Sequence, residues 1–312
     1  MNLVKKITIC EVGPRDGIQN EKNILAFEQK VELINDLTDA GFKVIEVGSF
    51  MHPKAVPQLA DTDAVFKKIN RREGVEYRAL IANVKGVERA INCGCSKVKL
   101  NVSASRAHNL SNLNRMPEDT IVGFKDSVHL ALANGIDVSG SISMPFGSPW
   151  EYKIPLEDIK SITEAYVKAG VNEISLSDTS GMGVPNQVYS ICKEMKRAFP
   201  DVKWILHFHN TRGTGIANIV AGMAAGFTWF DTSFAGAGGC PFVPGAAGNV
   251  STEDLVHMCD EMGIETGIDI DKVIAIGKKV TELIGHDGDS YVLRAGKSTD
   301  LLRSKPTGQE KK

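Results

Sequence analysis

Two histidines separated by one residue, His207 and His209, close an apolar stretch that begins at Trp204. In an extended strand, residues i and i+2 point to the same face, so both imidazoles would lie on one side, about 7 Å apart along the strand. Such a pair suits a divalent metal ion when oxygen ligands from other segments complete the site. The alternative is a pair of structural histidines that cap the strand.

Oxygen ligands for such a site are present in two other segments. Asp16 offers a carboxylate within GPRDG, and Asn249 offers an amide oxygen after a glycine-rich stretch. Two nitrogen and two oxygen ligands without a thiolate cluster favour Mg²⁺ or Mn²⁺, with Zn²⁺ as the alternative. Arg15, beside Asp16, is either one half of a local ion pair in a surface turn or a permanent cation suited to stabilising a developing oxyanion.

The glycine-rich segment 236–249 contains Cys240 between GAGG and PFVPG. A segment of this composition can approach a ligand closely and then fold over it. The thiol is a candidate proton donor or nucleophile, although its position alone favours a packing role. Because Pro241 occupies the last position of GAGGCP, the dinucleotide fingerprint G-x-G-x-x-G is not completed and is rejected.

The elements that must position these side chains alternate along the chain between short β-rich runs and amphipathic helical stretches. Strands are predicted at Ile7–Val12, Val44–Val47, Tyr77–Ile81, Lys97–Asn101, Asp137–Ser143, Glu173–Leu176, Val202–His207 and Thr228–Asp231. Helices are predicted at Glu28–Ala40, Val84–Asn92, Pro117–Asn134, Leu156–Ala169, Pro185–Phe199 and Gly215–Ala225. Eight such units predict an α/β fold of the (β/α)₈ TIM-barrel type, and an open doubly wound sheet is the alternative.

The barrel is expected to occupy residues 1–290 as one domain that includes the 236–249 segment and additional C-terminal helices from about Thr252 and from Ile270 to Ile284. Residues 291–312 are expected to form a partly disordered tail, because the segment RSKPTGQEKK is polar.

A barrel of this kind binds and reacts with its substrate where the strands end. The predicted strands end in a set of polar side chains: Arg15 and Asp16 after the first, Glu46 in the second, Asp178 after the sixth, His207 and His209 in the seventh, and Cys240 and Asn249 after the eighth. Their convergence at one mouth favours a metal site over a structural histidine pair.

Composition excludes several other classes of function. The formal net charge of −2 gives no basic surface for nucleic acid or for an anionic membrane. We find no apolar run long enough to span a bilayer and no apolar segment of a signal peptide in MNLVKKITIC, so a cytoplasmic location is expected. The six scattered cysteines are then expected to be reduced thiols.

Four segments resemble the 3-hydroxy-3-methylglutaryl-CoA (HMG-CoA) lyase family, and the similarity runs over roughly residues 3–290. They are EVGPRDGIQNEKN, IEVGSFMHPKAVPQLAD, HFHNTRGTGIAN and AGAGGCPFVPGAAGNVSTEDLV. The resemblance implies a (β/α)₈ barrel, a divalent cation and cleavage of an acyl-CoA substrate to acetyl-CoA and a keto acid. It also implies a homodimer, and leucine degradation is the pathway associated with this activity.

Carried over by position, the resemblance implies metal ligation by Asp16, His207, His209 and Asn249. It implies catalytic positions at Arg15, Glu46, Asp178 and Cys240. In a retro-Claisen cleavage we expect the base in the Asp16/His207 region, with Glu46 orienting, Arg15 stabilising the enolate and the thiol returning a proton.

Two residues depart from the family pattern. Asn210 follows His209 where the family usually has aspartate, and Ser148 stands where many members have cysteine. Both are expected near the mouth, where they would bear on the acyl substrate. HMG-CoA is the first prediction, and citramalyl-CoA or a branched hydroxyglutaryl-CoA is the alternative. A non-catalytic acyl-CoA-binding or metal-binding relative is the third hypothesis.

Overall fold

Eight parallel strands close into a barrel in the order β1-β2-β3-β4-β5-β6-β7-β8 in the computed structural model, which describes residues 3–239 and 247–303. The strands are β1 (Thr8–Glu11), β2 (Val44–Ser49), β3 (Glu76–Ile81), β4 (Lys97–Ser103), β5 (Asp137–Ser143), β6 (Glu173–Asp178), β7 (Lys203–Phe208) and β8 (Trp229–Thr232). The predicted strands are confirmed, with ends that differ by at most two residues.

Pairing of the first strand with the last distinguishes the barrel from the open sheet. β1 pairs with β2 through Cys10 and Val44, and with β8 through Glu11 and Thr232. All six residues of β2 are buried, because one face of the strand lines the barrel interior and the other lies under helices. The closed sheet confirms the (β/α)₈ prediction.

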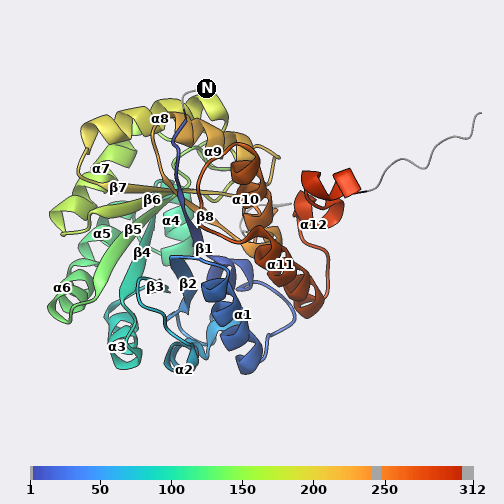
Figure 1. Cartoon of the computed structure of the whole chain (residues 1–312). Coiled ribbons are helices and arrows are strands. Elements are labelled where there is room, and N and C mark those ends of the chain that lie inside the picture. Colours follow the sequence, from blue (N-terminus) through green and yellow to red (C-terminus); the bar gives the residue numbers. More distant parts are fainter. Residues whose placement is uncertain (1–2, 240–246, 304–312) are drawn as a thin grey trace, which may run out of the picture.

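Helices surround the barrel on its outside (Figure 1). Those between the strands are α1 (Phe27–Asp39), α2 (Thr62–Lys68), α3 (Val84–Cys93), α4 (Arg106–Leu113), α5 (Pro117–Val122), α6 (Lys125–Ala133), α7 (Leu156–Lys168), α8 (Pro185–Ala198) and α9 (Gly215–Ala224). α3 ends at Gly94, whose φ of 69° is the left-handed conformation expected of a glycine that ends a helix.

Two features of the helical layer differ from the prediction. The single helix predicted over Pro117–Asn134 is two helices, because Gly123 ends α5 and α6 begins at Lys125. Helices α2 and α4 were not predicted, since each is only seven or eight residues long and gives a weak periodic signal.

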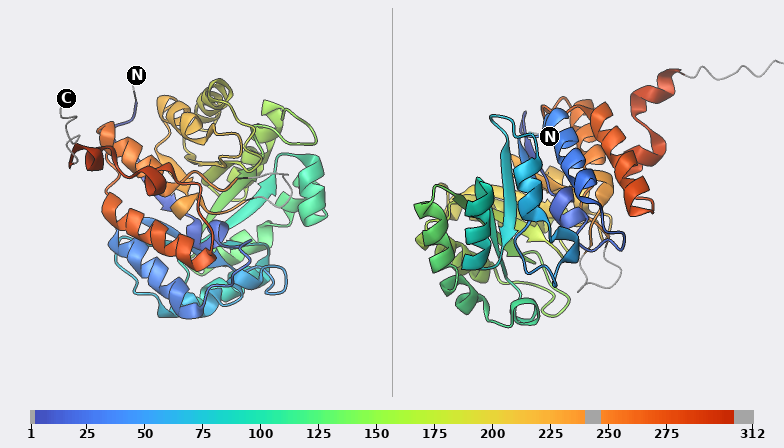
Figure 2. Two further views of the ribbon diagram at one scale, coloured as in Figure 1. Left: turned by 90° about the vertical axis from the view of Figure 1, so that its right-hand side faces the viewer. Right: turned by 90° about the horizontal axis from the view of Figure 1, so that it is seen from below.

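Three further helices follow the barrel: α10 (Thr252–Glu261), α11 (Ile270–Ile284) and α12 (Tyr291–Ala295). α11 lies beside α1, as Figure 2 shows, and Lys279 of α11 forms ion pairs with Glu32 at 2.7 Å and Asp36 at 2.9 Å. Part of the predicted tail is helical, at α12 and at Ser298–Arg303; residues 304–312 lie outside the described part of the chain.

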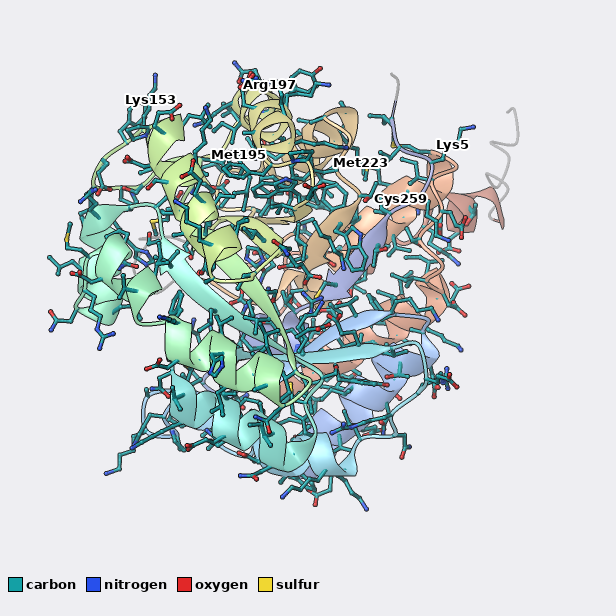
Figure 3. The ribbon with its side chains drawn as sticks, turned by 90° about the vertical axis from the view of Figure 1, so that its left-hand side faces the viewer. Lys5, Lys153, Met195, Arg197, Met223 and Cys259 are labelled. Atoms are coloured by element: carbon teal, nitrogen blue, oxygen red, sulfur yellow. The ribbon has the colours of Figure 1, made fainter. Side chains whose placement is uncertain are left out.

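Buried apolar side chains fill the space between the barrel and its helices. Met195 of α8, Met223 of α9 and Cys259 of α10 lie inside the fold in Figure 3, whereas Lys153 and Arg197 lie at its periphery. Within the described ranges, no helix is both long and apolar enough to cross a membrane.

Candidate active site

A short π-helical turn, Gly13–Gly17, carries Arg15 and Asp16 directly after β1. The carbonyl oxygen of Val12 accepts hydrogen bonds from the backbone N–H groups of Arg15 at 3.0 Å and Asp16 at 2.7 Å. Both side chains are buried, so GPRDG is not a surface turn. The turn directs a guanidinium and a carboxylate into the mouth of the barrel.

One ligand atom from each of Asp16, His207 and His209 lies within 4.8 Å of the other two, as a shared metal ion requires. The Nε2 atoms of His207 and His209 are each 3.8 Å from Oδ2 of Asp16. The two imidazole rings have centroids 5.2 Å apart. The structure therefore brings together three of the four predicted metal ligands.

Asn249 lies beside this group through a bridge between its backbone and that of His209. Its Nδ2 donates to Asp16 Oδ2 at 2.9 Å and to the carbonyl oxygen of Ala237 at 3.1 Å. Its Oδ1 is buried and has no hydrogen-bond partner among the described residues. A buried oxygen without a partner is costly, and a cation beside it would remove that cost. The donor set thus fits a divalent metal ion.

The protonation states of this group also suit a metal ion. Burial alone would raise the pKa of Asp16, but the charge of Arg15 and the neighbouring histidines outweigh burial and hold the pKa well below its ordinary value. Burial, reinforced by His207, lowers the pKa of His209 to about 4. Near neutral pH the carboxylate is ionised and the His209 imidazole is neutral, which are the forms that ligate metals.

Arg15 is fixed between two carboxylates. Its Nη1 donates to Asp16 Oδ1 and its Nε donates to Oε1 of Glu46, which lies within β2. Burial alone would raise the pKa of Glu46, but Arg15 and Lys99 outweigh it and lower the pKa. The guanidinium is consequently preorganised at the cavity, as stabilisation of an oxyanion requires.

Lys99 and Asp231 continue this charged layer across the barrel. Lys99 Nζ lies 2.8 Å from Glu46 Oε2 and 3.2 Å from Asp231 Oδ2. Asp231 Oδ2 is also 3.3 Å from Nδ1 of His207, because the parallel register of β7 and β8 places these residues side by side. Lys99 was not among the predicted site residues. Asp231 was predicted as the end of the eighth strand, which places it at the mouth, but without a role in the site.

Asp178 lies at the end of β6 and binds its own loop. Its carboxylate accepts hydrogen bonds from the backbone N–H groups of Gly183 at 2.9 Å and Met182 at 3.1 Å and from Ser180 Oγ at 3.3 Å. Burial outweighs these bonds and raises its pKa to about 6. The side chain is thus placed to shape the loop between β6 and α8.

A cavity of about 420 Å³ opens beside the metal-binding group. One side is apolar, with Met51, Ala55, Val56 and Leu80 from the end of β3 and the segment after β2. Next to it, the lining from β4, β5 and β6 is polar. Its members are Lys99, Asn101, Ser141, Ser143, Ser177 and the adjoining Thr179.

Cys240 lies outside the described residues. The residues on either side of the undescribed stretch reach the site: Gly239 lines the cavity and accepts a hydrogen bond from Asn20 Nδ2 at 2.8 Å, and the carbonyl oxygen of Ala247 lies 3.3 Å from His209 Nδ1.

The two departures from the family pattern lie away from the cavity surface. Asn210 Oδ1 accepts from the backbone N–H of Gly215 at 3.1 Å, at the start of α9. Ser148 Oγ donates to Glu151 and accepts from its backbone N–H at 3.0 Å, within the loop after β5. Neither residue is among those that line the cavity. Both lie in loops that follow the carboxyl ends of strands, near the mouth as expected, where they stabilise those loops and do not line the cavity.

The fold and the site together define a (β/α)₈ barrel with a candidate metal centre at the carboxyl ends of its strands. The HMGL-like family model matches residues 6–280, and the chain belongs to this family.

Relatives and solved structures of the family cover almost the whole chain. A hydroxymethylglutaryl-CoA lyase of Bacillus subtilis is 39% identical over 295 residues, covering 95% of this chain and 99% of the relative. A 3-hydroxy-3-isohexenylglutaryl-CoA/hydroxymethylglutaryl-CoA lyase of Pseudomonas aeruginosa is 36% identical (95% and 98% covered), and an (R)-citramalyl-CoA lyase of Chloroflexus aurantiacus is 36% identical (94% and 96%). The structure of an HMG-CoA lyase from Acinetobacter baumannii in complex with coenzyme A and 3-methylmalate superposes with a TM-score of 0.92 at 40% identity, covering 97% and 98% of the two chains. These relatives are carbon–carbon lyases, which favours an enzyme over a non-catalytic binding protein.

Proposed function

We propose that this chain is a metal-dependent lyase that cleaves HMG-CoA to acetyl-CoA and acetoacetate. The observation that carries the proposal is the buried group of Asp16, His207 and His209, beside Arg15 and an acyl-sized cavity, in a chain of the HMGL-like family. The partner is a small acyl-CoA, and neither nucleic acid nor a membrane is required.

The reaction breaks the bond between C2 and C3 of the acyl group. The tertiary hydroxyl on C3 loses its proton, the electron pair of the broken bond forms a thioester enolate, and the enolate carbon then receives a proton. A divalent cation, Mg²⁺ or Mn²⁺, held by Asp16, His207, His209 and Asn249 would favour the ionised hydroxyl and orient the substrate.

The remaining roles fall to side chains around that group. Arg15 is placed to stabilise the enolate oxygen, and Glu46 holds the guanidinium in position. We assign the base to the Asp16/His207 region and the return of the proton to Cys240. Asp178 accepts a hydrogen bond from the loop after β6. Its catalytic position, which the family resemblance implies, is part of the proposal.

Citramalyl-CoA is the second candidate substrate. The Chloroflexus aurantiacus relative covers this chain as completely as the HMG-CoA lyases do. The two acyl groups undergo the same bond cleavage, and the carboxylate of citramalyl-CoA is closer to C3 by one methylene group.

The test is turnover of purified protein with HMG-CoA and excess Mg²⁺ or Mn²⁺, with and without a chelator, following acetyl-CoA and acetoacetate. Chelator-sensitive formation of both products is expected, with loss in Asp16→Ala and retention in the exposed control Asp137→Ala. Turnover of citramalyl-CoA but not HMG-CoA would favour the second substrate. Turnover of neither by folded, metal-loaded protein would contradict a lyase.

We further propose a homodimer that acts in leucine degradation, on the strength of the family resemblance alone, and, from the sequence, a cytoplasmic location. Light scattering of the purified protein tests the dimer, and a species with the mass of one chain would contradict it.

A further inference from the structure

Four of the polar side chains that line the cavity come from three neighbouring strands and are here called the donor wall: Lys99 and Asn101 on β4, Ser141 on β5 and Ser177 on β6. The parallel register joins these strands in order, pairing Asn101 with Ser141 and linking β5 to β6. Residues two apart in a strand point to the same side, so Lys99 and Asn101 face the same way. The wall is therefore continuous across the three strands.

A chain of hydroxyl groups runs through the wall. Ser175 Oγ lies 3.1 Å from Ser177 Oγ, and Ser177 Oγ lies 3.0 Å from Ser141 Oγ. Three hydroxyls carry three protons, and these two contacts use two of them. Ser175 is fully buried whereas Ser141 lines the cavity. The arrangement in which each serine donates towards Ser141 leaves the third proton facing the cavity, where a ligand or water can accept it.

Two more donors stand beside Ser141. The Oδ1 atom of Asn101 accepts from Ser143 Oγ at 2.7 Å, so its Nδ2 hydrogens are what Asn101 can offer to a ligand. Lys99 has three ammonium protons, and its described partners are the two carboxylates of Glu46 and Asp231. The wall is therefore rich in donors, and its best partner is an acceptor oxygen.

We propose that the donor wall sets acyl specificity: it binds an acceptor oxygen of the acyl group, such as a carboxylate, and disfavours an acyl group that presents an apolar group in its place. This inference rests on the proposed lyase function and narrows its substrate class. It also moves specificity away from Ser148 and Asn210, which do not line the cavity.

An apolar chain against this wall would displace water from donors without replacing the hydrogen bonds. Leaving a buried donor without a partner costs about 1–3 kcal/mol. Two such donors would reduce kcat/KM by roughly 30-fold or more, since about 1.4 kcal/mol corresponds to a factor of ten. A site built to hydrogen-bond its substrate rejects an analogue that lacks the partner group more strongly than an apolar pocket does.

The experiment compares kcat/KM for HMG-CoA, citramalyl-CoA and 3-hydroxy-3-methylpentanoyl-CoA, in which a methyl group replaces the carboxylate of HMG-CoA, in the metal-loaded wild type and in Ser141→Ala. The wild type is expected to cleave at least one carboxylate substrate ~30-fold or more better than the methyl analogue. In Ser141→Ala the kcat/KM of the carboxylate substrate falls about tenfold and that of the methyl analogue does not, so the ratio of the two narrows. Affinity for free coenzyme A should stay unchanged, because the wall contacts only the acyl group.

Ser139→Ala is the matched control, because Ser139 lies two residues earlier on the same face of β5, is fully buried and does not line the cavity. Equal turnover of the methyl analogue and the carboxylate substrates by the wild type would overturn the inference. The inference would also be overturned if Ser139→Ala changed the ratio of the two kcat/KM values as much as Ser141→Ala does. If none of the three is cleaved, the lyase proposal fails. Equilibrium binding of the same acyl-CoAs then tests the wall separately, with those that carry the carboxylate expected to bind more tightly.

Discussion

Asp231 contacts two groups whose positions matter for the proposed chemistry. Its Oδ2 is 3.3 Å from His207 Nδ1 and 3.2 Å from Lys99 Nζ. A carboxylate that accepts from the second nitrogen of a metal-ligating histidine fixes the tautomer and raises the basicity of the ligand. Asp231 is therefore a positioning residue for His207.

Replacing Asp231 with asparagine keeps the shape and removes the charge. We expect Asp231→Asn to weaken metal affinity and to lower kcat, each by roughly 10–100-fold, because His207 loses its ionised partner. Titration of chelated protein with Mn²⁺ measures the affinity and steady-state kinetics measures kcat. Asp137→Asn, at the exposed start of β5, is the control. Unchanged metal affinity in Asp231→Asn would contradict the positioning role.

Arg15 combines charge with a planar fork that reaches Asp16 and Glu46 at once. Lysine keeps the charge but cannot make both contacts. We expect Arg15→Lys to lower kcat by roughly 100-fold or more with a smaller change in KM, since the lost interaction is made mainly in the transition state. Arg197→Lys at the periphery (Figure 3) should behave as wild type. A loss confined to KM would instead assign Arg15 to ground-state binding.

At the scale of elements, Glu11 joins four segments at the base of the site. Its Oε1 accepts from the backbone N–H groups of Gly13 at 2.7 Å and Phe234 at 3.0 Å, and Thr252 donates to its Oε2 at 2.6 Å. One side chain thus ties β1, the turn that carries Asp16, the Phe234–Gly236 turn and α10 together.

The charge state of Glu11 makes this junction sensitive to pH. Burial outweighs the hydrogen bonds and raises its pKa to about 8, from 4.5. The uncharged acid is favoured in the folded state, so its contribution to stability is full below pH 4.5 and is lost as pH rises through 8. Glutamine imitates the uncharged acid. Relative to wild type, Glu11→Gln should therefore gain stability as pH rises from 5 to 8, by up to roughly 1.4 kcal/mol per pH unit.

Denaturant unfolding at several pH values measures that difference. Glu28→Gln, on the exposed face of α1, serves as the control and should show no such trend. A constant difference between Glu11→Gln and wild type from pH 5 to 8 would mean that the folded state does not raise the pKa of Glu11.

The sequence predicts the strands and the metal-binding group better than the cavity wall, for a physical reason. Asp16, His207 and His209 follow or end buried strands, and every such end in a parallel barrel meets at one mouth. The residues of β4 alternate, with Lys97, Lys99, Asn101 and Ser103 on one face and Val98, Leu100 and Val102 on the other. Asn101 ends the predicted fourth strand, which already places it near the mouth, but the sequence does not say that the lysine face lines the barrel interior. Lys99 could therefore not be assigned to the cavity without the closed barrel.

At the scale of the whole molecule, metal binding should stabilise the fold, because its ligands lie far apart in sequence. Asp16 follows β1, while His207 and His209 belong to β7 and the residue after it. Ligands that come together only in the folded chain bind metal in that state alone, so binding adds to the free energy of unfolding. At 100 times Kd the gain is about 2.7 kcal/mol, a shift of several degrees in Tm.

Thermal unfolding of the full chain with chelator and with rising Mn²⁺ or Mg²⁺ measures this coupling without any turnover. The Tm should rise with the logarithm of metal concentration in the wild type and stay flat in His209→Ala, which removes a ligand from the buried group. His129→Ala, an exposed histidine on α6, is the matched control and should retain the full rise. A rise that persists in His209→Ala but disappears in His129→Ala would place the metal on the surface and separate the buried group from the cation. The relative size of the Mg²⁺ and Mn²⁺ shifts then ranks the two ions, because each shift reports the affinity of the folded chain for that ion.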